Sequence, residues 1–245
     1  MDGSEAAGAS PLRIGILQTD SVLETLQTRH GDYPQMFRQA LAAGADAALL
    51  EFRTIDAQRG PWPDPAGCDA YLITGSRHSV YDPLPWIATL VGFVRDALAA
   101  RRKVVGICFG HQLIAHFFGG ETAAAPVGWC VGVHDAQVLS TEPWMDPPAA
   151  RFALLSSHKD QVRRLPEGAR PFARTQRCPQ AGFVLGDQVL TFQGHPEFTR
   201  AYAADLLEVR APVLGQTLHE AALASLDEPV HADMVARWIL NFIRG

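Results

Sequence analysis

The chain has 245 residues, of which 47% are hydrophobic and 19% are charged, and its formal net charge at pH 7 is −5. A chain of this length can bury a sizeable core without disulfides or metals, and we expect one domain rather than two small ones. Acidic and basic residues are interspersed and no basic stripe occurs, so the charge pattern disfavours a nucleic-acid partner.

The N-terminal residues 1–11 are small and polar and are expected to form a disordered lead-in. They lack the basic and apolar regions of a signal peptide, and no apolar run approaches the roughly 20 residues that span a bilayer. The four cysteines form no C-x-x-C pair, which argues against a disulfide framework and a zinc knot. We therefore expect a cytoplasmic protein with no membrane span, no metal and no cofactor.

Strand-like and helix-like segments alternate through the first half of the chain. Buried strands are expected at residues 14–17, 47–52, 70–74 and 104–108, and helices at 33–43, from Pro85 to about residue 100, and at 111–118. Strands that alternate with helices predict a parallel sheet whose binding crevice lies at the carboxyl ends of the strands.

Strand-like runs separated by turns replace this alternation between residues 127 and 192, and they predict a mixed or partly antiparallel extension of the sheet. The runs are residues 131–139, 152–156, 181–185 and 189–192. After Glu197 the pattern is helical, and an apolar stripe near the C-terminus is expected to pack on the core; it consists of Val235, Trp238, Ile239 and Phe242. We expect residues 12–245 to form a single domain with a helical C-terminal extension over 199–245.

Cys108 lies where the expected strand 104–108 gives way to a helix, and Gly106 and Gly110 flank it as G-x-C-x-G. Small residues at these two positions let a strand and a helix cross closely, which lifts the cysteine side chain into the crevice. The N–H of Phe109 then points at the same space, and the partial positive charge of the helix N-terminus favours a thiolate. The pattern indicates a nucleophile; the alternative is a buried structural cysteine, which we favour for Cys68, Cys130 and Cys178.

A second segment, T-F-Q-G-H-P-E over residues 191–197, supplies a base for this cysteine. Alternate residues of an extended segment point the same way, so Glu197 can reach the imidazole of His195. The carboxylate would fix the ring tautomer and stabilise the imidazolium once His195 has taken the thiol proton. For this segment alone, a surface His-Pro turn is the alternative. Together with the strand-to-helix turn at Cys108, which we call the elbow, the segment predicts a hydrolytic triad of Cys108, His195 and Glu197.

The motifs G-I-C-F-G-H-Q (residues 106–112) and G-H-P-E (194–197) resemble those of the class I glutamine amidotransferase family, from about Leu12 to Phe198. The resemblance implies an α/β, flavodoxin-like fold with a mixed, mainly parallel sheet and helices on both faces. It also implies that Cys108 attacks a γ-glutamyl amide and forms a γ-glutamyl thioester. Ammonia or an amine leaves first, and water then releases glutamate. Gly75 would supply one N–H of the oxyanion hole and Phe109 the other.

The segment S-S-H-K-D over residues 156–160 resembles the S-H-x-D segment with which this family holds the α-amino and α-carboxylate groups of glutamine. By that match Ser157, His158 and Asp160 contact the substrate, as does Gln112 from the elbow helix. The residue chemistry agrees, because Asp160 suits an ammonium, while Ser157 with a main-chain N–H suits a carboxylate.

The leaving group stays open. The loop T-G-S-R-H over residues 74–78 lacks the Gly-Pro of many biosynthetic members. The segments I-T-G-S (73–76), D-P-x-P-W (82–86) and G-W (128–129) more closely resemble free-standing members such as plant γ-glutamyl peptidases and bacterial GMP-synthase-like proteins. One function is a glutaminase that donates ammonia to a separate synthetase subunit, and the alternative is a stand-alone γ-glutamyl peptidase or hydrolase. A non-catalytic binding module is a third.

Two other arrangements of histidine are less favoured. An α/β-hydrolase would need a distant histidine such as His219 or His231, and the close pairing of His195 with Glu197 argues against it. His111 and His116 lie five residues apart, about 140° around a helix, so they do not share a face that could bind a metal. Cys130 and His134 are expected to pack or pair locally.

Overall fold

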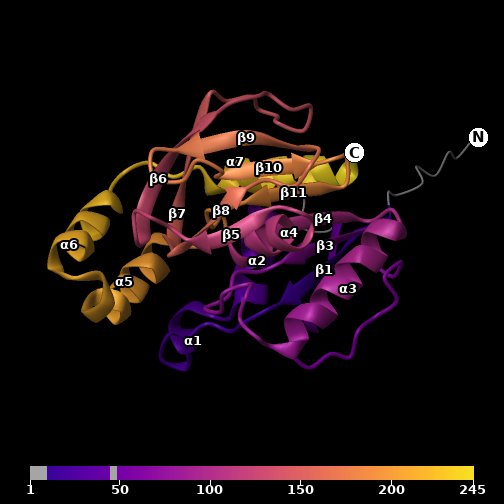
Figure 1. The fold of residues 1–245 in the computed structure, drawn as a ribbon, viewed down its shortest axis with the longest axis horizontal. Coiled ribbons are helices and arrows are strands. Elements are labelled where there is room, and N and C mark those ends of the chain that lie inside the picture. Colours follow the sequence, from indigo (N-terminus) through magenta and orange to yellow (C-terminus); the bar gives the residue numbers. More distant parts are fainter. Residues whose placement is uncertain (1–9, 45–48) are drawn as a thin grey trace, which may run out of the picture.

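The computed structural model describes residues 10–44 and 49–245. The strands in these ranges are β1 (Leu12–Gln18), β2 (Leu50–Asp56), β3 (Ala70–Ile73), β4 (Lys103–Ile107), β5 (Glu121–Ala124), β6 (Cys130–Val138), β7 (Arg151–His158), β8 (Asp160–Arg164), β9 (Ala169–Thr175), β10 (Gly182–Leu185) and β11 (Val189–Phe192). The helices are α1 (Glu24–His30), α2 (Tyr33–Ala43), α3 (Pro85–Ala99), α4 (Phe109–Phe117), α5 (Arg200–Leu214), α6 (Gln216–Ser225) and α7 (Ala232–Arg244). Figure 1 shows their arrangement around a central sheet.

The central sheet has the strand order β2-β1-β3-β4-β11-β10-β9-β6-β7, and β5 pairs with β8 in a small second sheet. Neighbours from β2 to β11 are parallel, and those from β11 to β7 are antiparallel. The central strands β3 and β4 are almost continuously apolar and buried, as expected for parallel strands covered on both faces. The predicted flavodoxin-like fold with an antiparallel extension is thus confirmed.

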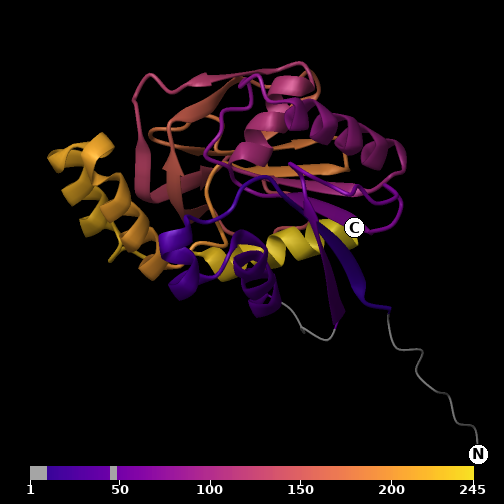
Figure 2. The same ribbon diagram turned by 90° about the horizontal axis from the view of Figure 1, so that it is seen from below.

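Helices cover both faces of the sheet. Figure 2 shows α2 and α7 on one face and α3 and α4 on the other. The first pair packs on a core that contains Phe37, Ile14 and Trp238, and the second pair on a core that contains Leu90, Leu113 and other buried side chains. The predicted apolar stripe of α7 is buried in this way, with Trp238 and Ile239 fully inaccessible.

A third apolar cluster attaches α5 and α6 to the antiparallel end of the sheet, where Leu206 and Ala222 join Val131 of β6 and Leu155 of β7. In Figure 1 these two helices lie beyond that end. The residues expected to form a helical extension are therefore helical in α5, α6 and α7. No helix in the described part of the chain is long and apolar enough to cross a membrane.

Several elements differ from the sequence prediction. The second strand was expected at residues 47–52 and is observed at Leu50–Asp56; positions 47–48 lie outside the described residues, as do residues 1–9 of the expected lead-in. β2 extends further because all seven of its residues pair in register with β1, although Arg53 and Thr54 are exposed. Backbone pairing thus sets its length. The sequence analysis also missed α1, β5, β8 and β9, whose polar or short segments carry weak periodicity.

Replacing Trp238 tests how strongly α7 holds the fold together. Its indole N–H donates to the Pro147 carbonyl at 2.9 Å, and its ring packs against Trp144 and Phe152. Trp238→Ala should lower the free energy of unfolding by about 3–5 kcal/mol, because a large buried side chain leaves a cavity. Urea unfolding followed by far-ultraviolet circular dichroism measures this. Trp238→Phe, which keeps an aromatic ring, should lower the free energy of unfolding by less. A decrease below about 1 kcal/mol for Trp238→Ala would contradict the burial of α7 against the sheet.

Candidate active site

Cys108 is the single residue between β4 and α4, and its backbone is strained. Its φ is 51° and its ψ is −95°, in a region that residues with a side chain rarely adopt. The surrounding contacts enforce this conformation: the Cys108 N–H donates to the Phe192 carbonyl of β11 at 2.8 Å. The turn places the Cys108 side chain at the carboxyl end of β4.

The glycines on either side of Cys108 are required by the close crossing of strand and helix. A Cβ at Gly106 would lie 2.7 Å from the carbonyl carbon and oxygen of Gly110. A Cβ at Gly110 would lie 2.7 Å from the Cβ of Ile73 and 2.8 Å from its carbonyl oxygen. Real Cβ atoms do not approach backbone this closely, so the G-x-C-x-G pattern has the steric origin expected from the sequence.

His195 is held beside the elbow by the backbone and by a carboxylate. Its N–H donates to the Leu155 carbonyl of β7 at 2.8 Å, and its Nδ1 lies 2.7 Å from Glu197 Oε1. The imidazole also stacks on the Phe198 ring, with centroids 3.8 Å apart and planes 10° apart. With Nδ1 engaged by the carboxylate, Nε2 is the ring nitrogen left for a proton exchange.

The charge around His195 favours its protonated form. Burial of the imidazole opposes protonation, but the Glu197 carboxylate and the Cys108 sulfur outweigh it and raise the pKa of His195 to about 10. Both His195 and Glu197 are almost fully buried, so water screens this attraction weakly. The arrangement suits an imidazolium beside a sulfur anion.

Gly75 lies against both Cys108 and His195. A Cβ at this position would be 2.9 Å from His195 Cε1 and 3.7 Å from the Cβ of Cys108. The loop that carries Gly75 is held by Thr19, whose hydroxyl donates to the Gly75 carbonyl at 2.8 Å and whose N–H donates to the Thr74 hydroxyl at 3.0 Å. Thr19 was not singled out from the sequence, because it acts through a tertiary contact.

Phe109 begins α4, so its N–H is among the four at a helix start that have no intrahelical acceptor. The N–H is therefore available to an anionic oxygen beside Cys108. Gln193 is a second residue that the sequence analysis missed: its Nε2 lies 3.6 Å from Cys108 Sγ. Its Oε1 accepts a hydrogen bond from Gln112 Nε2 at 3.2 Å, so the predicted residue Gln112 connects to the sulfur through Gln193.

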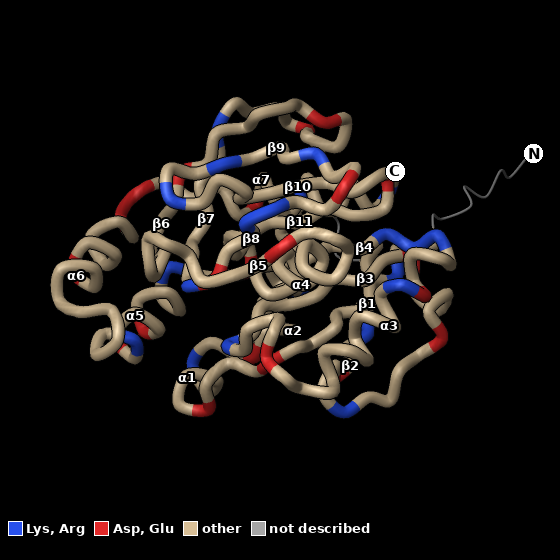
Figure 3. Tube along the Cα trace, viewed as in Figure 1, with Lys and Arg blue, Asp and Glu red and all other residues tan. Residues whose placement is uncertain are grey.

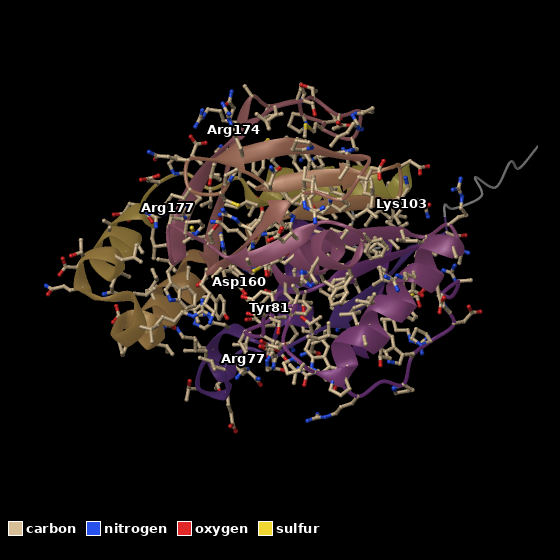
Figure 4. All side chains as sticks on the ribbon, viewed as in Figure 1. Arg77, Tyr81, Lys103, Asp160, Arg174 and Arg177 are labelled. Atoms are coloured by element: carbon tan, nitrogen blue, oxygen red, sulfur yellow. The ribbon has the colours of Figure 1, made fainter. Side chains whose placement is uncertain are left out.

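The residues expected to hold the substrate gather in one hollow of about 40 Å³, which we call the glutamyl hollow. Its lining includes Gln112, Ser157, His158 and Asp160. Asp160 Oδ2 accepts from the Ser79 hydroxyl at 2.5 Å, whereas Oδ1 is buried and has no hydrogen-bond partner within the described ranges. A buried carboxylate oxygen in this state suits a cationic ligand. Figure 4 labels Asp160 near the middle of the molecule, with Tyr81 and Arg77 close to it in this view.

The side chains around Asp160 mainly fix its position. Gln112 Nε2 donates to the Asp160 carbonyl at 2.8 Å, and His158 Nδ1 lies 3.0 Å from the same carbonyl. Burial lowers the pKa of His158 to about 3, so its ring is neutral and donates from Nδ1. The Ser157 hydroxyl accepts from Arg210 of α5.

The other histidines considered from the sequence lie elsewhere. His219 Nε2 lies 3.3 Å from Glu208 Oε1, and His231 Nδ1 accepts from the Ala153 N–H at 3.0 Å; neither lines the glutamyl hollow. His111 is buried with its Nδ1 2.9 Å from the Thr191 hydroxyl, and burial lowers its pKa to about 3. No group of three or more metal-ligating side chains occurs in residues 10–44 and 49–245.

The sequence and the structure were compared with those of known proteins, and both are similar to glutamine amidotransferases. Residues 35–208 match the family described as glutamine amidotransferase class-I. A glutamine amidotransferase-like protein of Schizosaccharomyces pombe is 30% identical over 94% of this chain and 98% of its own length. Gamma-glutamyl peptidase 3 of Arabidopsis thaliana is also 30% identical, over 91% of this chain and 92% of its own. The crystal structure of a glutamine amidotransferase from Methylobacillus flagellatus shares the fold, with a TM-score of 0.70, 23% identity and 95% of each chain covered.

A methyl group at position 75 tests whether His195 acts on Cys108. Gly75→Ala should slow alkylation of Cys108 by iodoacetamide at pH 7 about tenfold, because the new Cβ displaces an imidazole that favours the reactive thiolate. Peptide mapping by mass spectrometry measures the rate at this cysteine alone. Gly92→Ala is the matched control, since a Cβ there meets nothing within 4 Å. Equal alkylation rates for Gly75→Ala and the parent protein would show that His195 does not act on Cys108.

The raised pKa of His195 also predicts a pH-dependent stability. Histidine in the unfolded chain has its ordinary value of 6.5, so between pH 6.5 and about 10 the folded state binds more protons than the unfolded state. The stabilisation by His195 is therefore complete below pH 6.5 and is lost as pH rises towards 10, by up to about 1.4 kcal/mol per pH unit. Urea unfolding across this range should give a steeper decline for the parent protein than for Glu197→Gln. Parallel curves for the two proteins would show that Glu197 does not stabilise the imidazolium.

Proposed function

We propose that this chain, which belongs to the class I glutamine amidotransferase family, hydrolyses a γ-glutamyl amide with Cys108 as nucleophile, His195 as base and Glu197 as partner of the base. The observation that carries the proposal is the buried His195–Glu197 contact of 2.7 Å beside the strained turn at Cys108. A base oriented by a carboxylate and adjacent to a sulfur is the arrangement that nucleophilic acyl transfer needs.

The first half-reaction transfers the γ-glutamyl group to sulfur. The Cys108 thiolate attacks the γ-carbonyl carbon, a C–S bond forms, and the carbonyl oxygen becomes an oxyanion that accepts from the N–H groups of Gly75 and Phe109. His195, as imidazolium, gives its proton to the leaving nitrogen. The C–N bond then breaks, which releases ammonia or an amine and leaves a γ-glutamyl thioester.

The second half-reaction returns the enzyme to its starting state. Neutral His195 takes a proton from a water molecule as that water attacks the thioester carbon, and the same two N–H groups hold the oxyanion. The C–S bond breaks, glutamate leaves, and Cys108 is again a thiolate beside an imidazolium. Each N–H donor should contribute about 10²–10³ in rate.

The glutamyl hollow supplies contacts for the α-amino and α-carboxylate groups of the substrate. Asp160 Oδ1 accepts from the α-ammonium, and Ser157 with a main-chain N–H holds the α-carboxylate. His158, Gln112 and Ser79 keep the Asp160 segment in place through their hydrogen bonds to it. Two separate contacts, one to the α-ammonium and one to the α-carboxylate, together fix the orientation of the glutamyl group.

Two identities of the leaving group compete. In a glutaminase, ammonia would pass to a separate synthetase subunit; in a stand-alone γ-glutamyl peptidase or hydrolase, an amine or amino acid would leave into solvent. The relative named gamma-glutamyl peptidase is aligned over 92% of its own length, which favours the stand-alone reading. Figure 3 shows basic and acidic residues interspersed along the trace, which gives no support to a nucleic-acid partner.

Replacement of the nucleophile tests the proposal. The purified full chain is offered glutamine and a panel of γ-glutamyl amides and peptides, and released glutamate and ammonia are measured. Cys108→Ser and Cys108→Ala should lower kcat by about 10³-fold or more, because the acyl transfer loses its acceptor. A glutamine-like electrophile should label Cys108. The control is Cys68→Ala, which replaces a buried cysteine remote from the elbow; this variant should keep the activity and the labelling of the parent protein.

The outcomes separate the candidate functions. Hydrolysis of peptides with little glutaminase activity excludes the ammonia donor, and glutaminase activity alone excludes the peptidase. Undiminished activity in Cys108→Ala or in His195→Ala would overturn the triad. No hydrolysis and no labelling of the parent protein would favour the non-catalytic binding module.

A further inference from the structure

A second hollow, of about 150 Å³, adjoins the glutamyl hollow. We call it the α5 hollow; Gly75 and His195 line it from one side, and Phe198, Leu206 and Arg210 line it from the other. The two hollows share four lining residues, Ser76, Arg77, Ser157 and Arg210, which form the boundary between them. The site therefore has two compartments that meet at these four residues, and Gly75, which lies beside Cys108, lines the second of them.

The position of the general acid assigns the two compartments to the two halves of a γ-glutamyl amide. His195 lines only the α5 hollow, whereas Asp160 lines only the glutamyl hollow. Because the acid must reach the leaving nitrogen, the leaving group extends into the hollow that His195 lines. A molecule the size of water or ammonia needs only about 10–15 Å³ of such space, so the α5 hollow, with about 150 Å³, is far larger than ammonia requires.

Arg210 carries a charge that no acidic group in its surroundings compensates. Its guanidinium stacks on the Trp129 ring at 4.9 Å and donates to the carbonyl and the hydroxyl of Ser157. No ion pair to Arg210 occurs among the residues that the structure describes. The side chain is half-buried, and burial lowers its pKa.

The other charges of the α5 hollow are already paired. Arg77 Nε lies 2.7 Å from Asp20 Oδ2, and its backbone N–H donates to the same oxygen at 2.8 Å. Within the described lining of this hollow, Arg210 is thus the cation available to a ligand. A desolvated guanidinium presents a planar fork of donors whose preferred partner is a carboxylate.

We propose that the leaving group of the substrate carries a free carboxylate, which Arg210 binds in the α5 hollow. The inference rests on the proposed γ-glutamyl amide hydrolysis and names its substrate class: a γ-glutamyl amino acid or peptide. Water is the only co-reactant; the C–N bond of the γ-amide is cleaved, and the products are glutamate and an amino acid or peptide with a free amine. The apolar wall formed by Leu23, Phe198 and Leu206 suits the side chain of that product.

Because Arg210 touches Ser157, it could instead serve the α-carboxylate of the glutamyl half, and the test must separate the two. The substrates are γ-glutamyl-alanine and γ-glutamyl-alaninamide, which differ only in the charge of the leaving group. With the full-length parent protein, kcat/KM should favour γ-glutamyl-alanine at least about tenfold, since a site built for a polar group rejects the analogue that lacks it.

Arg210→Gln should remove that preference. We expect kcat/KM for γ-glutamyl-alanine to fall about 10–100-fold and that for γ-glutamyl-alaninamide to change less than about threefold. Arg210→Lys keeps the positive charge but loses the planar set of guanidinium donors. Its preference for γ-glutamyl-alanine should be intermediate between those of the parent protein and Arg210→Gln. Arg237→Gln, on the exposed side of α7, is the control for loss of an arginine and should keep the preference.

Three results would overturn the inference or the premise. An equal loss on both substrates in Arg210→Gln places Arg210 on the glutamyl half, and an absent preference in the parent protein removes carboxylate recognition; in both cases γ-glutamyl hydrolysis stands. Failure of the parent protein to hydrolyse any γ-glutamyl amide would instead remove the proposed function. If circular dichroism shows that Arg210→Gln does not fold, two results decide whether Arg210 binds the carboxylate. These are the preference of the parent protein for γ-glutamyl-alanine and the size of that preference in Arg210→Lys.

Discussion

The close approach of α4 to β3 and β4 is the constraint on which the candidate site depends. Cβ atoms at Gly106 and Gly110 would lie 2.7 Å from neighbouring atoms, so the helix can begin at this point only with glycine at both positions. The crossing leaves one residue, Cys108, between strand and helix, and forces its φ to 51°. The same turn exposes the N–H of Phe109 and turns Gln112 towards the Asp160 segment. The proposed nucleophile, the proposed anion donor and the proposed substrate contact thus share one steric origin.

The parts of the site that could be predicted from the sequence are those that local geometry determines. The elbow is contained in a few consecutive residues, and His195 and Glu197 are only two residues apart. Their contact was predicted correctly, but Pro196 and Glu197 form a turn and not the expected extended segment. The parallel order of β1, β3 and β4 followed from their apolar runs and intervening helices. For Gln112, Ser157, His158 and Asp160, the resemblance to a family was needed, because no local pattern brings β7 and β8 to the elbow.

What the sequence could not provide depends on tertiary contacts between distant segments. Thr19 holds the Gly75 loop from the end of β1. Arg210 reaches Ser157 from the part of α5 that lies beyond residue 208, where the family match ends. Gln193 lies within a predicted motif, but its contact with the sulfur depends on how β11 aligns with β4. β9 and the part of β2 beyond residue 52 form by backbone pairing with neighbouring strands, and their charged side chains hide that pairing from any hydrophobic pattern.

The side-chain amides of Gln112 and Gln193 connect the two ends of the site. Gln193 donates towards the sulfur and accepts from Gln112, which also donates to the Asp160 carbonyl. Removal of the Gln112 amide takes away the donor to Gln193 Oε1, and removal of the Gln193 amide takes away one of the two acceptors of Gln112 Nε2. Either loss in a buried site is costly. The two positions are therefore not free to vary independently: a change at one is tolerated only with a compensating change at the other. Across relatives that keep this geometry, positions 112 and 193 should diverge as a pair.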